Sequence, residues 1–216
     1  MSECSLIVAN LAHEHLLSYA EREERFSKLL KFNGLKQLPN VRVESFLEQI
    51  SRTVAGQQLS TKAADTIWAR VEGLHKSFGS TFDNFIINQS DIDLRQCGLS
   101  RAKIRTIRGL VDGAMDGQLD TRSLVEMDHL ALTSHLTSFW GIGLWTAEMM
   151  AIFFFHSPDV WSKGDVGLKN SLSFLFSDEK KKLKLVDRAA PYRSYLSLHL
   201  WAGLDEGFYN LDIDGC

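Results

Sequence analysis

The stretch LTSFWGIGLWTAEMMAIFFFHSPDVWSKGDVGLKNSL, residues 136–172, decides the fold. In it, Gly141 and Gly143 flank one apolar residue, and a long apolar helical pattern follows at once. Glycines so placed let the backbone take positive φ and leave no Cβ over the turn. The amides that open the next helix lack internal acceptors and carry the positive end of its dipole. The pattern predicts a turn between two helices that can receive a phosphate without a basic side chain.

The same stretch places a carboxylate shortly after this second helix. We expect the helix to end near His156, because Pro158 stops it. Asp165 follows in a Lys-Gly-Asp turn before another helix, and we expect it close in space to the glycine turn. Taken singly, both features have ordinary explanations. A Gly-x-Gly turn can be a plain helix–helix connection, and Asp is a common N-cap.

Composition allows a sizeable globular core. The chain has 216 residues, of which 44% are hydrophobic, enough for one large domain or two small lobes. No charge-free apolar run reaches the ~18 residues of a membrane span, and the first residues do not resemble a secretory signal. The net charge is −3, with 24 Lys+Arg against 27 Asp+Glu. This balance argues mildly against nucleic acid, although a local basic face can exist under a neutral total.

Cysteine and histidine usage favours neither a disulfide framework nor a zinc site. The three cysteines, Cys4, Cys97 and Cys216, are far apart, which indicates a reducing compartment. The histidines show no paired ligand spacing.

Apolar periodicity predicts helices throughout, and no Val/Ile-rich alternation predicts a strand. We expect helices over residues 5–20, from Phe26 to a stop at Asn33-Gly34, from Phe46 through Val54, from Thr61 to Gly73 after the cap Ser60, from Arg101 through Arg108 after the cap Ser100, from the cap Asp128 to the turn, and over 191–201. Pro39-Asn40 indicates a loop, and residues 177–184 a charged linker. Basic residues after Ser100 are more often a solvated face than a specific contact.

Several motifs together resemble the helix–hairpin–helix DNA glycosylase superfamily and, within it, the 3-methyladenine DNA glycosylase II branch. They are Gly-Ile-Gly-x-Trp-Thr-Ala from Gly141, Asp-Val-Trp from Asp159, and Gly-Asp-x-x-Leu-Lys from Gly164. Trp145 and Asp165 lie 20 positions apart, the spacing of that branch between its pocket tryptophan and its catalytic aspartate. The Gly56–Ser60 turn, Gly98-Leu99-Ser100-x-x-Lys103 and the helix around Trp201 also match, so that the resemblance covers about residues 40–205.

The resemblance implies an all-α, two-lobed fold with the active site in the cleft between the lobes. We expect residues 1–40 to form an N-terminal helical segment that packs on the core, residues 41–205 the glycosylase core of two helical lobes, and residues 206–216 a tail. The mixed β domain of larger bacterial members has no counterpart here. The four-cysteine iron–sulfur loop of the endonuclease III-like branch is also missing from the sequence.

The implied reaction is base excision repair by a monofunctional DNA glycosylase. It hydrolyses the N-glycosidic bond of alkylated purines, of the 3-methyladenine type, in duplex DNA after flipping the nucleotide. Asp165 is the expected catalytic residue, because a carboxylate stabilises the oxocarbenium character of the sugar and orients a water. Bifunctional members have their Schiff-base lysine at the position of Trp145, so no strand cleavage by an amine is expected here.

The resemblance also assigns the surfaces that hold the base and the DNA. The expected substrate pocket consists of Trp145, Met149 and Trp201; the expected DNA-binding residues are Gly141, Ile142, Gly143, Gln57, Gln58, Leu59 and Lys169. Gln58 matches the side chain that fills the gap left by a flipped base, while Leu59 either assists or anchors its loop in the core. Two positions depart from the family: Met149 stands where the well-studied bacterial member has a tyrosine, and Trp140 where the hairpin more often has proline.

Other functions stay open at this point. The chain could excise another damaged or mismatched base, or it could be a helix–hairpin–helix DNA-binding module without catalysis, which would not need Asp165. Trp145 and Trp201 could equally be core tryptophans. We expect double-stranded DNA as the partner of a monomer, no membrane, and a location in the bacterial cytoplasm or a eukaryotic nucleus. No cofactor is expected beyond a monovalent cation that the hairpin backbone could hold.

Overall fold

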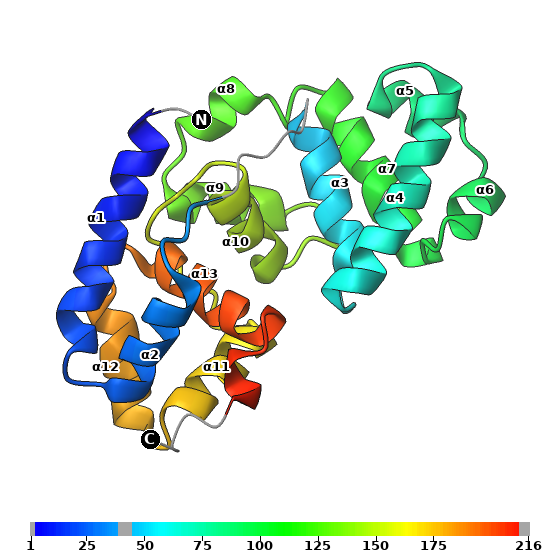
Figure 1. Ribbon diagram of the computed structural model, residues 1–216. Coiled ribbons are helices and arrows are strands. Elements are labelled where there is room, and N and C mark those ends of the chain that lie inside the picture. Colours follow the sequence, from blue (N-terminus) through cyan, green and yellow to red (C-terminus); the bar gives the residue numbers. More distant parts are fainter. Residues whose placement is uncertain (1–2, 39–44, 212–216) are drawn as a thin grey trace. The chain divides into compact units, whose positions relative to one another are not determined.

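The computed structural model describes residues 3–38 and 45–211, and within these ranges it contains helices and no strand (Figure 1). The helices are α1 (Glu3–Ala20), α2 (Glu24–Asn33), α3 (Phe46–Gly56), α4 (Thr61–Phe78), α5 (Phe82–Asn88), α6 (Asp91–Gln96), α7 (Arg101–Met115), α8 (Thr121–Val125), α9 (His129–Thr137), α10 (Leu144–Phe153), α11 (Val166–Leu175), α12 (Glu179–Arg188) and α13 (Arg193–Asp205), followed by a 3-10 turn, η1 (Phe208–Asn210). The all-α prediction is confirmed. The loop expected at Pro39-Asn40 and the last residues of the tail lie outside the described residues.

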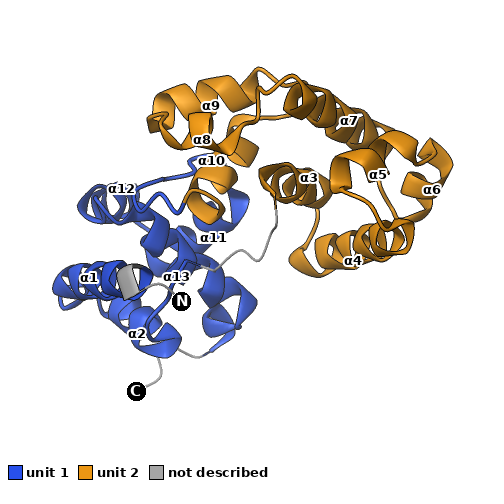
Figure 2. Ribbon diagram, turned by 90° about the horizontal axis from the view of Figure 1, so that it is seen from above, with its two compact units in different colours: residues 1–40, 156–216 blue, residues 41–155 orange. Residues whose placement is uncertain are grey.

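The chain forms two compact units, which Figure 2 shows in different colours. The first unit combines residues 1–40 with 156–216, and the second comprises residues 41–155. The N-terminal helices therefore share a core with the C-terminal helices, although most of the chain separates them in sequence.

In the first unit, α13 is the central helix and contacts α1, α2 and α11. Its apolar side chains, including Leu196 and Leu200, are fully buried against Phe26 and Leu29 of α2 and the rest of the core. His199 is buried with them, and desolvation lowers its pKa to about 3, helped by the charges of His13 and Lys36. The Asn33 side-chain nitrogen lies 3.3 Å from Nδ1 of the His199 ring and donates to the His199 carbonyl at 2.8 Å, so this ring has a polar partner inside the core.

In the second unit, α3 packs on α4, α7 and α10, and α9 packs on α10. Ile50 and Val54 of α3 are fully buried, and Ile104 and Ile107 of α7 are nearly so. This packing fixes three segments relative to one another: the turn after α3, the start of α7 and the turn between α9 and α10.

The predicted helix caps are confirmed. The side chains of Ser60, Ser100, Asp128 and Asp165 each accept a hydrogen bond from the amide three residues later. These contacts are local, so the sequence alone specifies them.

Several predicted boundaries differ from the structure: α7 continues past Arg108 to Met115, and α13 spans Arg193–Asp205 instead of 191–201. The segment 177–184 is not a linker, because α12 begins at Glu179 with Asp178 as its cap and buries Leu185 and Val186. Lys and Glu are good helix formers, and their charges lie on the solvated side. α4 continues past Gly73 to Phe78, since one interior glycine costs only about 1 kcal/mol. α10 ends at Phe153, earlier than the expected His156.

None of the described helices combines the length and apolarity that a membrane span requires.

Candidate functional site

The turn between α9 and α10 contains one glycine that the backbone requires. Gly141 has φ +81°, a left-handed conformation that favours glycine. A Cβ at this position would also collide with the hydroxyl of Thr106, a buried residue of α7. Ile142 is buried and anchors the turn in the core. The backbone of the turn can therefore approach α7 only because residue 141 lacks a side chain.

Gly143 serves a different purpose from Gly141. Its φ is −94° and ψ 171°, which any residue adopts, so the expectation of positive φ at both glycines is wrong for this one. It is the N-cap of α10, and no side chain caps the helix there. A Cβ would meet nothing within 4 Å. The exposed glycine leaves the start of α10 open to solvent, where an anion is favoured by the helix dipole.

Gln57 joins the turn after α3 to the α9–α10 turn. Its side-chain amide donates to the carbonyl of Gly141 at 3.2 Å and to the hydroxyl of Thr146 at 2.9 Å. Gln57 was expected on the DNA-binding surface; in this structure its half-buried side chain braces the hairpin.

Lys103 fixes the same turn from α7. Its ammonium donates to the carbonyls of Ala55 at 2.8 Å and Gln57 at 3.0 Å, and burial lowers its pKa. The prediction of a solvated basic face is therefore wrong for Lys103. The three matched motifs of this unit form one hydrogen-bonded assembly.

Gln58 and Leu59 are presented to solvent by that braced turn. Gln58 has φ +59°, which is uncommon for a residue with a Cβ, and strained conformations of this kind cluster at ligand-contacting sites. Leu59 is 41% exposed, so the alternative that it anchors the loop in the core is wrong.

In the first unit, Asp165 caps α11 and contacts α13. Its Oδ1 accepts from the amide of Leu168 at 2.8 Å and from the indole Nε1 of Trp201 at 3.1 Å. Asp165 and Trp201 are both half-buried. Two donors on one oxygen from two helices fix the orientation of the carboxylate.

Gly167 makes that arrangement possible. A Cβ on Gly167 would lie 3.1 Å from Asp165 Oδ1 and 3.3 Å from Trp201 Cδ1. Both are tighter than ordinary van der Waals contact, so a side chain here would push the carboxylate and the indole. The sequence shows Gly167 two residues after Asp165, but only the packing reveals its role.

No family model matches the sequence. DNA-3-methyladenine glycosylase 1 of Schizosaccharomyces pombe is 28% identical over 187 residues, which cover 83% of this chain and 82% of the relative. The structure of 3-methyladenine DNA glycosylase from the same yeast, in complex with abasic DNA, superposes with a TM-score of 0.79, at 26% identity over 90% of this chain and 96% of that one.

A crystal structure of DNA-3-methyladenine glycosidase from Bacillus halodurans decides the family. It is 32% identical, covers 88% of each chain, and superposes with a TM-score of 0.69. This chain belongs to the 3-methyladenine DNA glycosylase family.

The other positions assigned from the glycosylase family are distributed over both units. Trp145, the second residue of α10, is half-buried, whereas Met149 is only 5% exposed and has little surface left for a ligand. Both belong to the second unit, and Asp165 and Trp201 to the first. Lys169 is exposed on α11 and lines a cavity of about 390 Å³ with Lys163 and Trp161.

Within residues 3–38 and 45–211, no group of three or more His, Cys, Asp or Glu side chains could hold a metal ion.

The two hairpin glycines should respond differently to serine. Gly141→Ser should lower the free energy of unfolding by about 1–3 kcal/mol, because the left-handed backbone and Thr106 both oppose a Cβ. Gly143→Ser is the matched control and should be neutral or slightly stabilising, because serine caps helices well. Urea denaturation of both variants measures the difference. Equal effects would contradict the assignment of the strained position to Gly141.

Proposed function

We propose that this protein is a monofunctional DNA glycosylase that releases alkylated purines, of the 3-methyladenine type, from duplex DNA. The observation that carries the proposal is the Asp165 carboxylate, held by the Leu168 amide and the Trp201 indole. The relatives named above are 3-methyladenine glycosylases, and one of them has been solved with abasic DNA, the kind of DNA that base release leaves behind. This protein acts as a monomer. Its compartment is the one that holds the DNA, which is the cytoplasm of a bacterium or the nucleus of a eukaryote.

The chemistry follows from the charge that develops on the sugar. As the bond from the purine nitrogen to C1′ breaks, its electron pair leaves with the base and C1′ gains oxocarbenium character. The Asp165 carboxylate stabilises that positive charge and orients a water, whose oxygen bonds to C1′ while its proton leaves to solvent or the departing base. A purine made cationic by alkylation departs more readily than a neutral one. This reaction uses water as the nucleophile and requires no cofactor.

Base selection then rests on aromatic surface. Indoles attract cationic rings more strongly than neutral ones, which favours alkylated purines on Trp145 and Trp201. Trp145 offers no amine to attack C1′, so the released product is an intact strand with an abasic site.

DNA docking in this proposal uses the braced turns of the second unit. The open start of α10 at Gly143 receives a backbone phosphate, and the exposed Gln58 and Leu59 enter the stack. Lys169 adds a charge contact from α11.

Incubation with dimethyl sulfate-treated duplex DNA, followed by chromatography of the soluble fraction, tests the proposal. Release of free 3-methyladenine is the expected result. Duplex binding without any released base would instead identify a DNA-binding module.

Asp165→Asn should abolish most base release while the fold persists. Asparagine caps helices as well as aspartate and its amide oxygen can still accept from Leu168 and Trp201, but it carries no charge for the sugar cation. We expect single-turnover release to fall by about 10²–10³-fold, with affinity for an abasic analogue retained. Asp128→Asn is the matched control, since Asp128 caps α9 through an equivalent 2.8 Å bond to Ala131. Similar rates for Asp165→Asn and Asp128→Asn would remove Asp165 from the mechanism.

Gln58→Ala and Leu59→Ala should identify the side chain that fills the stack. Unstacking costs a few kcal/mol, so loss of the filling side chain should slow excision more than it weakens duplex binding. A mismatch opposite the damaged base already lowers the flipping cost and should partly rescue the responsible variant. The measurement is single-turnover excision on paired and mismatched substrates. If both variants excise at the normal rate, the wedge lies elsewhere in the chain.

A further inference from the structure

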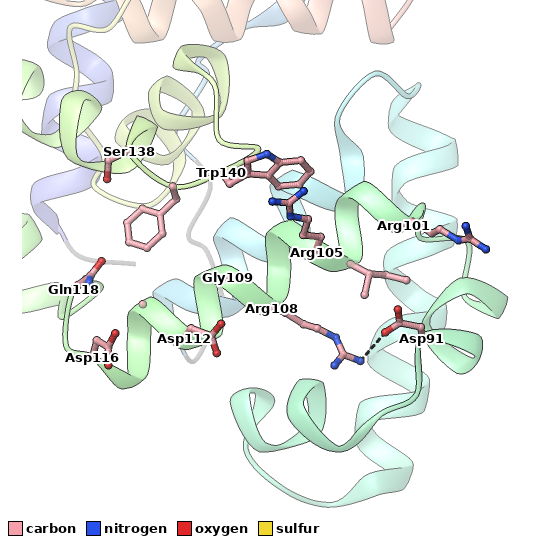
Figure 3. A pocket seen from close by; sticks show the side chains of 13 residues that line it. Asp91, Arg101, Arg105, Arg108, Gly109, Asp112, Asp116, Gln118, Ser138 and Trp140 are labelled. Atoms are coloured by element: carbon pink, nitrogen blue, oxygen red, sulfur yellow. Dashed lines mark ion pairs between the residues drawn. The ribbon is translucent and has the colours of Figure 1, made fainter.

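A groove of about 660 Å³ runs along α7 beside the residues that lead into the hairpin (Figure 3). One end is basic and aromatic, lined by Arg101, Arg105 and Trp140, and the other is acidic, lined by Asp112 and Asp116. The sequence motifs assign no role to this groove.

The basic end contains a preformed stack. The guanidinium carbon of Arg105 lies 4.1 Å from the centre of the Trp140 ring, and the indole is 51% exposed. Stacking fixes the plane of a guanidinium and leaves its N–H edges free to bind an oxyanion. Figure 3 shows the two side chains together at the wall of the groove.

The stack on Trp140 leaves the charge of Arg105 without an oppositely charged partner. Among the described residues, neither Arg105 nor Arg101, one helical turn earlier, has an ion-pair partner. Arg108, in contrast, pairs with Asp91 at 2.8 Å and donates to the carbonyl of Gln89 at 2.9 Å. Two of the three groove arginines are therefore available to a ligand.

The position of Arg101 on the helix is also unfavourable for stability. Arg101 is the first residue of α7, whose first turn contains no acidic residue, so the helix dipole opposes its charge. Carboxylates at the start of α7 would stabilise the helix more than an arginine does.

We propose that Arg105 and Trp140, with Arg101, bind the sugar–phosphate backbone of the DNA duplex next to the hairpin phosphate. This inference rests on the duplex DNA of the proposed function. A phosphodiester matches the unpaired guanidinium edges, and Thr106, the residue after Arg105, packs directly under Gly141, so the surface continues from the hairpin. The carboxylates of Asp112 and Asp116 repel phosphate and end the contact along α7.

The salt dependence of duplex binding tests this contact. Each neutralised phosphate contributes about 0.9 to the slope of log Kobs against log[salt]. Arg105→Ala should therefore reduce the magnitude of the slope by about 0.9. The affinity lost by this variant relative to the wild type should be about eightfold greater at 0.1 M salt than at 1 M. The probe is an undamaged duplex, because a backbone contact reads no base.

Two further variants separate the stack from charge in general. Trp140→Ala should weaken binding but change the slope by less than half as much, because the Arg105 charge remains. Arg122→Ala is the matched control: it removes an exposed arginine of α8 that does not line the groove, and its slope should equal that of the wild type. An unchanged slope for Arg105→Ala, or an equal loss for Arg122→Ala, would overturn the proposal and leave the groove to a different partner, such as an acidic protein segment.

Base release by the same preparations distinguishes this inference from the proposed function. If the wild type releases 3-methyladenine but Arg105→Ala keeps its salt slope, only the inference fails. If the slope depends on Arg105 but no base is released, the contact stands and the glycosylase proposal fails.

Discussion

One carboxylate oxygen, Asp165 Oδ1, connects the local structure of the first unit to the chemistry that we propose for it. It receives the Leu168 amide from its own helix and the Trp201 indole from α13. Further along the same helix pair, the Ser171 hydroxyl donates to the carbonyl of Leu200 at 2.9 Å. Hydrogen bonds to a charged acceptor contribute about 1.5–3 kcal/mol each, so the Trp201 contact also stabilises the α11–α13 pair. The closeness of these helices, which Gly167 permits, sets where the charge points.

The second unit uses the same strategy with a neutral amide and an ammonium as the donors. Gln57 and Lys103 occupy three backbone carbonyls and one hydroxyl, and thereby hold the turn after α3, the α9–α10 turn and α7 together. Because the half-buried side chains of Gln57 and Lys103 hold the loops, the residues at the loop tips are not needed for the core. The backbone amide of Gly143 and the side chains of Gln58 and Leu59 therefore face solvent. In the proposed function, oriented amides rather than a basic surface supply part of the attraction to DNA, which is how a chain of net charge −3 binds a polyanion.

The helices and their caps could largely be predicted from the sequence, because they depend on residues that are close together in the chain. Helix caps such as Ser60 and Asp165 depend on residues three positions apart, and the all-α class follows from apolar periodicity. Contacts between distant segments could not be predicted. The roles of Lys103, Gln57 and Gly167 follow from packing of helices that are far apart in sequence. The conformation of Gly143 and the start of α12 were misjudged because composition alone does not distinguish an N-cap glycine from a left-handed one, or a charged helix from a charged linker.

The central claim is that the oriented carboxylate of Asp165 promotes hydrolysis of the glycosidic bond by water, and Trp201→Phe tests it most directly. Phenylalanine keeps an aromatic surface for the base but removes the N–H that binds Oδ1. Single-turnover release of 3-methyladenine at saturating protein should fall about 10–100-fold, because misorientation of a catalytic group is costly, while affinity for an abasic duplex stays within about twofold of the wild type. A normal rate of release by Trp201→Phe would contradict the account.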